Sequence, residues 1–339
     1  MIHHSVARSR DPGGPIVAAR GIVKHWGSTT ALDGATFEIG RGITGLLGSN
    51  GAGKTTLLGM MLGLHRPDQG HLEVLGLDPV HSGAEVRERV GYSPEHHILP
   101  PDTTAQDLVR HIAEIHGLPP REATGRASDA LWQVGLGEER FRPIGTMSTG
   151  QRQRVKLAQA IAHDPHLVLL DEPTDGLDPV QRDDMLALIR RVGTEFGIDI
   201  ILSSHLLEEV ERLCDDAVIM GAGRVVAAGA IAELTGADRG LLVEVDERPA
   251  ELADALVRRG LDVERDGHRL VVSWPPTQAH SGAGNGDSAT GPGPGHAHDA
   301  AAPSLYPVVR DALVASGSGL RRLTNRTVSL EDVFLEVDR

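Results

Sequence analysis

The clearest chemical signal in this sequence is a glycine-rich segment suited to binding phosphate. Residues 48–55 read GSNGAGKT and match the pattern G-x-x-x-x-G-K-[ST], with an apolar run before them and a helical pattern after them. The glycines let successive backbone N–H groups point inward at a helix N-terminus, which favours an anion. The segment predicts a triphosphate site formed by Gly48, Ser49, Asn50, Gly51, Ala52, Gly53, Lys54, Thr55 and Thr56.

Four side chains indicate how a bound triphosphate would be handled. Lys54 is expected to reach the β- and γ-phosphates, and Thr55 to place its hydroxyl on Mg²⁺. Asp171 and Glu172 end the apolar run HLVLLDE, a position where open α/β sheets place their ligand chemistry. We expect Asp171 to hold Mg²⁺, directly or through water, and Glu172 to polarise an attacking water.

The elements that must position these residues follow an alternating pattern. Short apolar runs at residues 42–47, 167–170 and 198–202 alternate with helical patterns. This alternation predicts an α/β fold in which helices cover a parallel sheet. Between about residues 95 and 165 the pattern is mainly helical, with Leu108, Ile112 and Ile115 spaced along one face of a candidate helix. We interpret this stretch as a helical insertion in the α/β domain.

A further motif separates this chain from most phosphate-loop enzymes. Residues 147–151 read MSTGQ and are followed by RQRVKLAQAIA, which resembles the LSGGQ signature of the ATP-binding-cassette (ABC) ATPases. Other parts of that family's pattern occur in the same order within residues 16–238. They are Trp26, similar to the aromatic residue that stacks on adenine; GYSPE at 91–95, similar to the Q-loop; GLDP with Asp178, similar to the D-loop; and His205, similar to the switch histidine.

The resemblance implies a fold, a cofactor pair and a partner. The fold is a RecA-like phosphate-loop nucleotide-binding domain with a helical subdomain, and the cofactors are ATP and Mg²⁺. The signature residues would bind the γ-phosphate held by a second subunit, so that two copies form two composite sites in a homodimer. Those residues are Ser148, Thr149, Gly150 and Gln151.

The remaining motif residues take catalytic or coupling roles in this resemblance. His205 would contact the γ-phosphate and hold the attacking water together with Glu172, and Asp178 would relay between the two sites. Glu95 would bind Mg²⁺ or water. Two of these positions depart from the family pattern. Thr149 replaces a glycine of the signature, and Glu95 replaces the usual glutamine, which adds negative charge beside the phosphates and predicts a steeper dependence on magnesium.

Composition narrows the partners and the location. The chain has 339 residues, with 33 Lys and Arg against 47 Asp and Glu, a net charge of −14 that argues against a nucleic-acid binder. No stretch approaches the ~20 apolar residues of a spanning helix. A transport pathway would therefore lie in a separate integral-membrane permease, with this chain peripheral on the inner, cytoplasmic face. The single Cys214 and the absence of a signal-peptide pattern agree with a cytoplasmic location.

Pattern changes along the chain suggest its domain boundaries. Residues 1–15 are predicted to be a disordered tail, 16–239 a nucleotide-binding domain, and 240–339 a small accessory α+β domain with a hairpin turn at Asp266 and Gly267. Residues 275–303 are rich in Gly and Pro, which predicts a flexible insert. Three histidines in the insert form only a weak metal-binding pattern; they are His280, His296 and His298.

Transport is the function that these motifs favour. GYSPE, STGQ and the C-terminal segment VSLEDVFL at 328–335 resemble the ATPase subunits of multidrug or antibiotic exporters, which implies export of a drug, antibiotic, lipid or similar solute. Residues 92–99 are the candidate contact with the permease. The alternative is a soluble ATP switch that dimerises without moving a solute. A GTPase is disfavoured because the chain lacks the N-K-x-D guanine motif.

Overall fold

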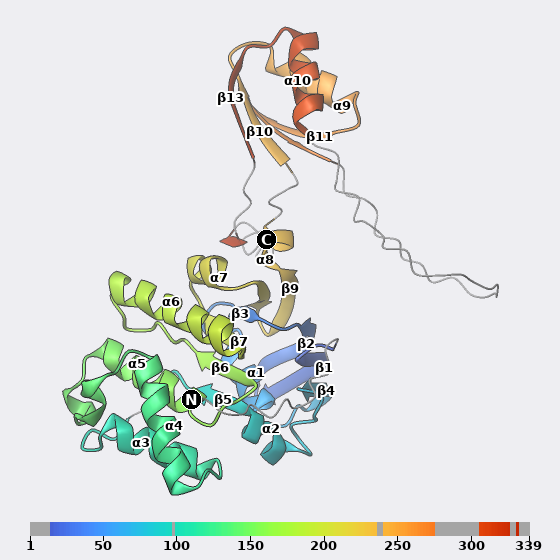
Figure 1. The fold of residues 1–339 in the computed structure, drawn as a ribbon. Coiled ribbons are helices and arrows are strands. Elements are labelled where there is room, and N and C mark those ends of the chain that lie inside the picture. Colours follow the sequence, from blue (N-terminus) through green and yellow to red (C-terminus); the bar gives the residue numbers. More distant parts are fainter. Residues whose placement is uncertain (1–13, 97–98, 236–239, 275–304, 326–329, 332–339) are drawn as a thin grey trace, which may run out of the picture. The chain divides into compact units, whose positions relative to one another are not determined.

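A six-stranded sheet carries the predicted phosphate loop and the Asp171–Glu172 pair (Figure 1). The computed structural model describes residues 14–96, 99–235, 240–274, 305–325 and 330–331. These residues form two units, Met1–Leu234 with Leu330–Arg339, and Thr235–Ser329. Among the described residues, no helix combines the length and the apolar character needed to span a bilayer.

The central sheet of the first unit is mostly parallel. Its strands, in spatial order, are β5 (Val90–Ser93), β6 (Leu167–Asp171), β7 (Asp199–Ser204), β3 (Ile43–Leu47), β8 (Asp216–Gly221) and β9 (Arg224–Ala230). Only the pairing of β8 with β9 is antiparallel. In the register of the central strands, Leu47 of β3 pairs with Ser204 of β7, and Ser203 pairs with Asp171 of β6. The carboxyl ends of three strands therefore meet, as the predicted α/β fold requires.

Apolar layers cover both faces of this sheet. On β6, Val168 and Leu170 join a core with residues of α6 (Pro179–Phe196) and α7 (Leu207–Leu213). Leu167 and Leu169 point into a second core with α1 (Lys54–Met61). That second core also includes residues of an antiparallel sheet, in the order β2 (Thr29–Ile39), β1 (Val17–Trp26) and β4 (Gln69–Val74). Burial on both faces explains why β6 reads as a continuous apolar run.

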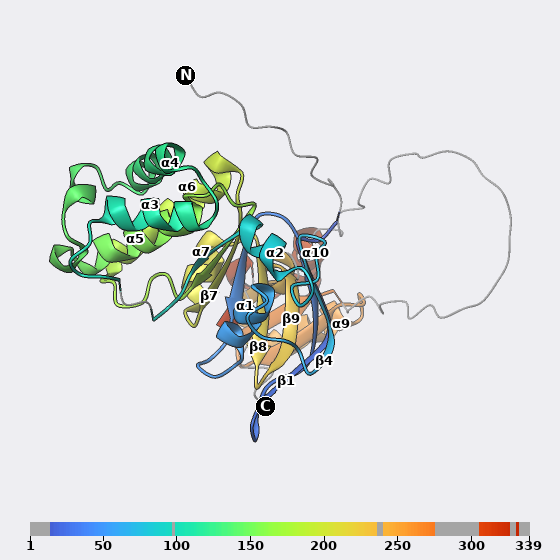
Figure 2. The ribbon, with the colours of Figure 1, turned by 90° about the horizontal axis from the view of Figure 1, so that it is seen from below.

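The helical insertion lies between β5 and β6, within the limits that the sequence predicts. Its α-helices are α3 (Ala105–Ile115), α4 (Pro120–Gln133) and α5 (Thr149–Ile161), with short 3₁₀ turns at Glu138–Phe141 and Ile144–Thr146; the shorter α2 (Gly83–Arg89) precedes β5. Figures 1 and 2 show α3, α4 and α5 grouped together to one side of the central sheet. The predicted apolar face of α3 is only partly correct, because Leu108 is buried whereas Ile115 is 65% exposed.

Two histidines stack where the end of α3 meets the loop after α5. The imidazole rings of His116 and His163 are nearly parallel, with an interplanar angle of 9° and 3.7 Å between ring centroids. Burial lowers the pKa of His163 to about 3, with a smaller effect from the charge of His116. Burial also lowers the pKa of His116. Both rings are therefore neutral at physiological pH.

The second unit has the βαββαβ arrangement of a ferredoxin-like fold. Its elements are β10 (Gly240–Val245), α9 (Pro249–Val257), β11 (Asp262–Asp266), β12 (Arg269–Ser273), α10 (Leu305–Ser316) and β13 (Leu320–Asn325). The antiparallel sheet has the order β11-β12-β10-β13, and both helices contribute to one apolar core with the inward side chains of β10 and β12. Gly267 has a φ of 58°, as the predicted hairpin turn between β11 and β12 requires.

The chain returns to the first unit after the second one. Leu330 is fully buried among residues of the first unit, and its backbone N–H donates a 2.6 Å hydrogen bond to Glu211 Oε1. The sequence prediction places residues 240–339 in one domain, whereas the second unit spans Thr235–Ser329. The difference arises because the side chain of Leu330 completes the first unit's core. The short helix α8 (Ile231–Leu234) precedes the second unit. Residues 1–13, most of the predicted tail, and the predicted insert at 275–303 with its three histidines lie outside the described residues.

The stacked histidines predict an acid-dependent loss of stability. The pKa of His163 in the folded state is about 3, below its ordinary value of about 6.5. The unfolded chain therefore binds more protons below pH ~6.5, and the free energy of unfolding falls as the pH drops. Urea unfolding at pH 7.5 and 5.0 should show a smaller pH effect for His163→Phe than for the wild type. His111, an exposed histidine of α3, provides the control. If His111→Phe reduced the pH dependence of unfolding as much as His163→Phe, the buried His163 would not be its origin.

The burial of Leu330 predicts that the first unit loses stability when this side chain is truncated. Leu330→Ala should lower the free energy of unfolding by about 2–5 kcal/mol, the usual cost of a buried leucine. Val314→Ala is the matched control, because that side chain is 79% exposed on α10. Thermal and urea unfolding of both variants would measure the effect. A Leu330→Ala transition that coincides with that of the wild type would show that residue 330 is not part of this core.

Candidate functional site

The phosphate loop joins the end of β3 to the start of α1, and its glycines are required by close backbone approaches. Gly53 has a φ of 100°, and a Cβ atom there would lie 2.4 Å from the carbonyl oxygen of Ala31. A Cβ atom on Gly48 would lie 2.7 Å from the carbonyl oxygen of Met220. Gly51 also has a positive φ, of 86°. A side chain would clash at Gly48 and Gly53 and would be strained at Gly51, so the sequence pattern reflects a backbone shaped as an anion cradle.

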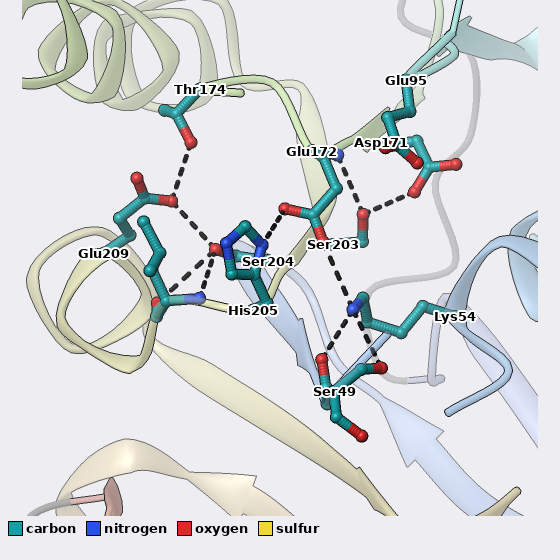
Figure 3. A network of polar contacts seen from close by, with 12 residues as sticks. Ser49, Lys54, Glu95, Asp171, Glu172, Thr174, Ser203, Ser204, His205 and Glu209 are labelled. Carbon is teal, nitrogen blue, oxygen red and sulfur yellow. Dashed lines mark hydrogen bonds and ion pairs between the residues drawn. The ribbon is translucent and has the colours of Figure 1, made fainter. Parts of the chain in front are cut away.

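Lys54 is the buried cation of this site. Its Nζ donates a 2.6 Å hydrogen bond to the carbonyl oxygen of Gly48 and lies 3.2 Å from Glu172 Oε1 (Figure 3). The side chain is only 7% exposed. A buried ammonium group with few partners is costly in free energy, which favours binding of a phosphate anion beside it. The structure thus brings the predicted phosphate-binding lysine and the predicted catalytic carboxylate into direct contact.

Asp171 is held by a serine that the sequence analysis did not single out. Ser203 Oγ donates a 2.6 Å hydrogen bond to Asp171 Oδ1 and accepts one of 2.9 Å from the backbone N–H of Glu172. Asp171 Oδ2 is buried without a hydrogen-bond partner among the described residues. A buried carboxylate oxygen without a donor suits a hard cation such as Mg²⁺, which takes one or two protein carboxylates together with phosphate oxygens. The residues present therefore fit the metal that the fold implies.

Glu172 and His205, which the sequence predicts to hold the attacking water together, are in direct contact. His205 Nδ1 lies 2.9 Å from Glu172 Oε2, and the Glu172 side chain is 8% exposed against 45% for His205 (Figure 3). The backbone of Glu172 has a φ of 47°, in the left-handed region that side-chain-bearing residues rarely adopt. Such strain is typical of functional positions. The carboxylate is thus held in a fixed position, with the histidine beside it facing solvent.

Glu95 is drawn beside Asp171 in the view of Figure 3, and its place at the metal or water stays a prediction. Burial raises the pKa of Tyr92 to about 12, with further contributions from the charges of Asp171 and Glu95. The loop is held by a residue that the sequence analysis missed. Lys156 on α5 is buried and donates hydrogen bonds to the carbonyl oxygens of Glu95, at 2.8 Å, and Pro94, at 3.3 Å. Burial lowers the pKa of Lys156.

The signature residues lie at the start of α5. Ser148 is the N-cap, and its Oγ accepts from the N–H of Gln151 at 3.2 Å. Gln151 Oε1 accepts a 3.0 Å hydrogen bond from the N–H of Ser148, which completes a capping box. Thr149 Oγ1 accepts from Arg152 at 3.1 Å. Within the described part of the chain, none of the residues 148–151 hydrogen-bonds to the phosphate loop or to the end of β6.

Trp26 and Asp178 occupy exposed ends of their elements. Trp26 ends β1, is 47% exposed, and contacts the edge of His65 and the ammonium group of Lys24. An exposed indole face suits stacking on a base. Asp178 is the N-cap of α6, and its Oδ1 accepts from the N–H of Gln181 at 2.9 Å. Among the described residues, no hydrogen bond or ion pair joins either residue to Glu172 or His205.

The sequence analysis also missed Ser204 and Glu209. Glu209 on α7 is 3% exposed and accepts hydrogen bonds from Ser204 and Thr174. The available signal for Ser203 and Ser204 was their place at the end of the apolar run IILSS, directly before His205. No local motif marks Glu209 or Lys156. Their roles depend on residues far away in the sequence.

Comparison with known proteins agrees with this geometry. A family model described as ABC transporter matches residues 32–175. The chain is 36% identical over 260 residues to the Nod factor export ATP-binding protein I of Ralstonia nicotianae, covering 76% of this chain and 80% of that one. It is 35% identical to the daunorubicin resistance ATP-binding protein DrrA3 of Streptomyces coeruleorubidus, covering 77% and 83%, and 36% identical to the linearmycin resistance ATP-binding protein LnrL of Bacillus subtilis, covering 65% and 70%.

A solved structure gives the same result for the fold. The cbiO1 subunit from Clostridium perfringens, part of an ABC transporter complex, matches with a TM-score of 0.60 and 28% identity, over 66% of this chain and 92% of that one. The predicted α/β phosphate-loop fold is confirmed, and the relatives support transport rather than the soluble-switch alternative. The chain belongs to the ATP-hydrolysing, ATP-binding subunits of ABC transporters.

Proposed function

We propose that this chain works as a homodimer that binds two Mg²⁺-ATP molecules and drives export through a separate membrane permease. The observation that carries the proposal is the contact of Glu172 with both Lys54 and His205, at the end of β6 beside the phosphate loop. One carboxylate is thus joined to a phosphate-binding cation on one side and to a histidine on the other. This arrangement suits hydrolysis of a terminal phosphate.

ATP binding follows from the chemistry of the loop. The backbone N–H groups of residues 48–56 surround the phosphates, and Lys54 exchanges its contact with Glu172 for one with the β- and γ-phosphates. Trp26 stacks on the adenine. Thr55, Asp171 and Glu95 are the residues that would hold Mg²⁺, which neutralises charge on the phosphate oxygens. Movement of Lys54 to the phosphates leaves the carboxylate of Glu172 free to accept a hydrogen bond from water.

Hydrolysis then uses the catalytic pair. A water molecule held by Glu172 and His205 attacks the γ-phosphorus, the bond to the β–γ bridging oxygen breaks, and ADP leaves with phosphate. Glu172 accepts the proton of that water in the transition state. His205 contacts the γ-phosphate. The positive φ of Glu172 and the hydrogen bond from its N–H to Ser203 Oγ hold the backbone from which the carboxylate extends.

The second subunit supplies the other half of each site. The N-terminus of α5 carries Ser148, Thr149, Gly150 and Gln151 without a contact to this chain's own phosphate loop among the described residues, which supports their use in trans. Two copies related by a two-fold axis would pair each loop with the partner's signature. Asp178, at the start of α6, would lie between the two sites. ATP would then be part of the interface, and its hydrolysis would open the dimer.

Export is the direction that the relatives favour. Three of them are named for Nod factor export or for resistance to daunorubicin or linearmycin. By analogy, the solute of this system would be an antibiotic, drug, lipid or similar molecule. The permease would contact residues 92–99, of which 97 and 98 lie outside the described ranges, and would hold the chain at the cytoplasmic face of the membrane. Closure of the dimer would pull the permease halves together.

Glu172→Gln should retain ATP binding and lose hydrolysis. The amide keeps the size of the carboxylate but cannot accept the water's proton, so kcat should fall by about 10²–10⁴-fold, the usual contribution of a general base. Phosphate release and fluorescent-nucleotide titration measure the two effects. Glu208→Gln, at an exposed position on α7, is the control and should keep the wild-type rate. Wild-type hydrolysis by Glu172→Gln would refute the assigned base.

Sites shared between subunits predict complementation between two inactive variants. Lys54→Ala removes the phosphate-binding cation and Ser148→Arg blocks the signature, so each homodimer should be inactive. A mixed dimer retains one intact site, and random mixing should restore about a quarter of the wild-type rate. ATPase activity and ATP-dependent dimer formation in the mixture are the measurements. If the mixture neither hydrolyses ATP nor forms ATP-dependent mixed dimers, the composite site is wrong.

A further inference from the structure

Glu209 is a buried acidic residue that the roles proposed above do not use. It lies on α7, and its side chain is 4% exposed. It accepts hydrogen bonds from Thr174 and Ser204, which lie close in the chain to the catalytic pair. We propose that Glu209 is a positioning residue for hydrolysis, which fixes the relative placement of Glu172 and His205. This inference rests on the proposed roles of that pair.

One oxygen of Glu209 joins the two segments that carry the catalytic residues. Glu209 Oε2 accepts a 2.8 Å hydrogen bond from Thr174 Oγ1 and a 2.9 Å hydrogen bond from Ser204 Oγ (Figure 3). Thr174 follows Glu172 by two residues, and Ser204 directly precedes His205. One acceptor, Glu209 Oε2, therefore links the chain segments that carry Glu172 and His205, whose side chains are 2.9 Å apart.

The serine passes this constraint on to the backbone that carries the histidine. Ser204 Oγ donates to Glu209 and also accepts a 3.0 Å hydrogen bond from the N–H of Leu206. The backbone on both sides of His205 is therefore tied to one hydroxyl. The side chain of His205 itself is 45% exposed. Its direction depends on the turn that Ser204 and Glu209 fix.

The other oxygen of Glu209 contacts α6. Arg182 Nε lies 3.2 Å from Glu209 Oε1, as an ion pair without an aligned hydrogen bond. Helix α6 begins after Asp178, the residue proposed to lie between the two ATP sites. The carboxylate therefore joins three segments: the end of β6, the end of β7 and the first turn of α6. A shift of α6 would change the position of both catalytic side chains.

Packing alone does not account for a carboxylate at this place. Burial of a charged group is costly, and an apolar residue of similar size would fill the space at lower cost. A carboxylate supplies two acceptor oxygens, and here one takes two hydroxyl donors while the other faces a guanidinium group. A glutamine has one acceptor oxygen, so it cannot satisfy both sides at once. The carboxylate of Glu209 therefore serves to position its neighbours. Its replacement should lower the rate of hydrolysis and not the affinity for the nucleotide.

A double-mutant cycle tests the proposal in the full-length chain. The variants are Glu209→Gln, His205→Ala and the double variant, with Glu208→Gln as the matched control on the same helix. If Glu209 acts through His205, Glu209→Gln should lower kcat about tenfold and leave the ATP dissociation constant within about twofold. In the His205→Ala background the same change should cost less than about twofold in kcat.

Three outcomes would overturn the proposal. The first is a Glu209→Gln variant with the wild-type kcat, and the second is a pair of losses that multiply in the double variant. The third is a fall in ATP affinity and thermal midpoint that accounts for the whole loss in rate, which indicates a structural role. A wild-type kcat for His205→Ala would also refute the proposed catalytic pair. If His205→Ala lowers kcat as expected but the two single losses multiply in the double variant, only the role of Glu209 is refuted.

A milder pair of variants covers the case in which Glu209→Gln does not fold. Thr174→Ser keeps the hydroxyl donor, whereas Thr174→Val keeps the shape and removes it. We expect Thr174→Ser to retain kcat and Thr174→Val to lower it about fivefold, at unchanged ATP affinity. Equal rates for the two variants would show that the hydrogen bond to Glu209 does not position the catalytic pair.

Discussion

The parallel register of three central strands is the constraint on which the rest of the structure depends. Because Leu47 pairs with Ser204 and Ser203 pairs with Asp171, the phosphate loop, the acidic pair and the histidine start from neighbouring points on one sheet edge. The two apolar cores hold this register, since a slip by one residue would exchange Val168 and Leu170 with Leu167 and Leu169 between the layers. The geometry of the site is thus a consequence of how the sheet is buried.

The charged side chains at that edge form one connected group, in which a single lysine faces two carboxylates. Lys54 contacts Glu172, and Glu172 contacts His205. Asp171 accepts a hydrogen bond from Ser203. In the proposed function, this coupling would let the site respond to a phosphate group as a unit. An added anion competes with Glu172 for the lysine and changes the partners of the carboxylate. Binding and preparation for catalysis are therefore linked through one side chain.

Motifs that act through contiguous residues could be predicted from the sequence, and those that act through tertiary contacts could not. The phosphate loop, the acidic strand end and the helical insertion follow from local patterns, because backbone shape and burial at each depend on neighbours in the chain. Ser203, Lys156 and Glu209 have no such pattern. Their partners lie 27 to 62 residues away, apart from Ser204, and only the folded chain brings them together. The α+β character of the second unit was predicted, whereas its strand order β11-β12-β10-β13 was not, because strand patterns alone do not encode which strands pair.

The return of the chain to the first unit has a consequence for biosynthesis. Leu330 belongs to the core of the first unit, yet all of residues 235–329 precede it in translation. Domains generally fold as units in the order in which they leave the ribosome. Here the nucleotide-binding unit lacks one of its core side chains until the ferredoxin-like unit has been made. The nucleotide-binding unit therefore reaches its full stability only after residue 330 has been made, so a product truncated before this residue would carry the motifs of the candidate site on an incompletely packed unit.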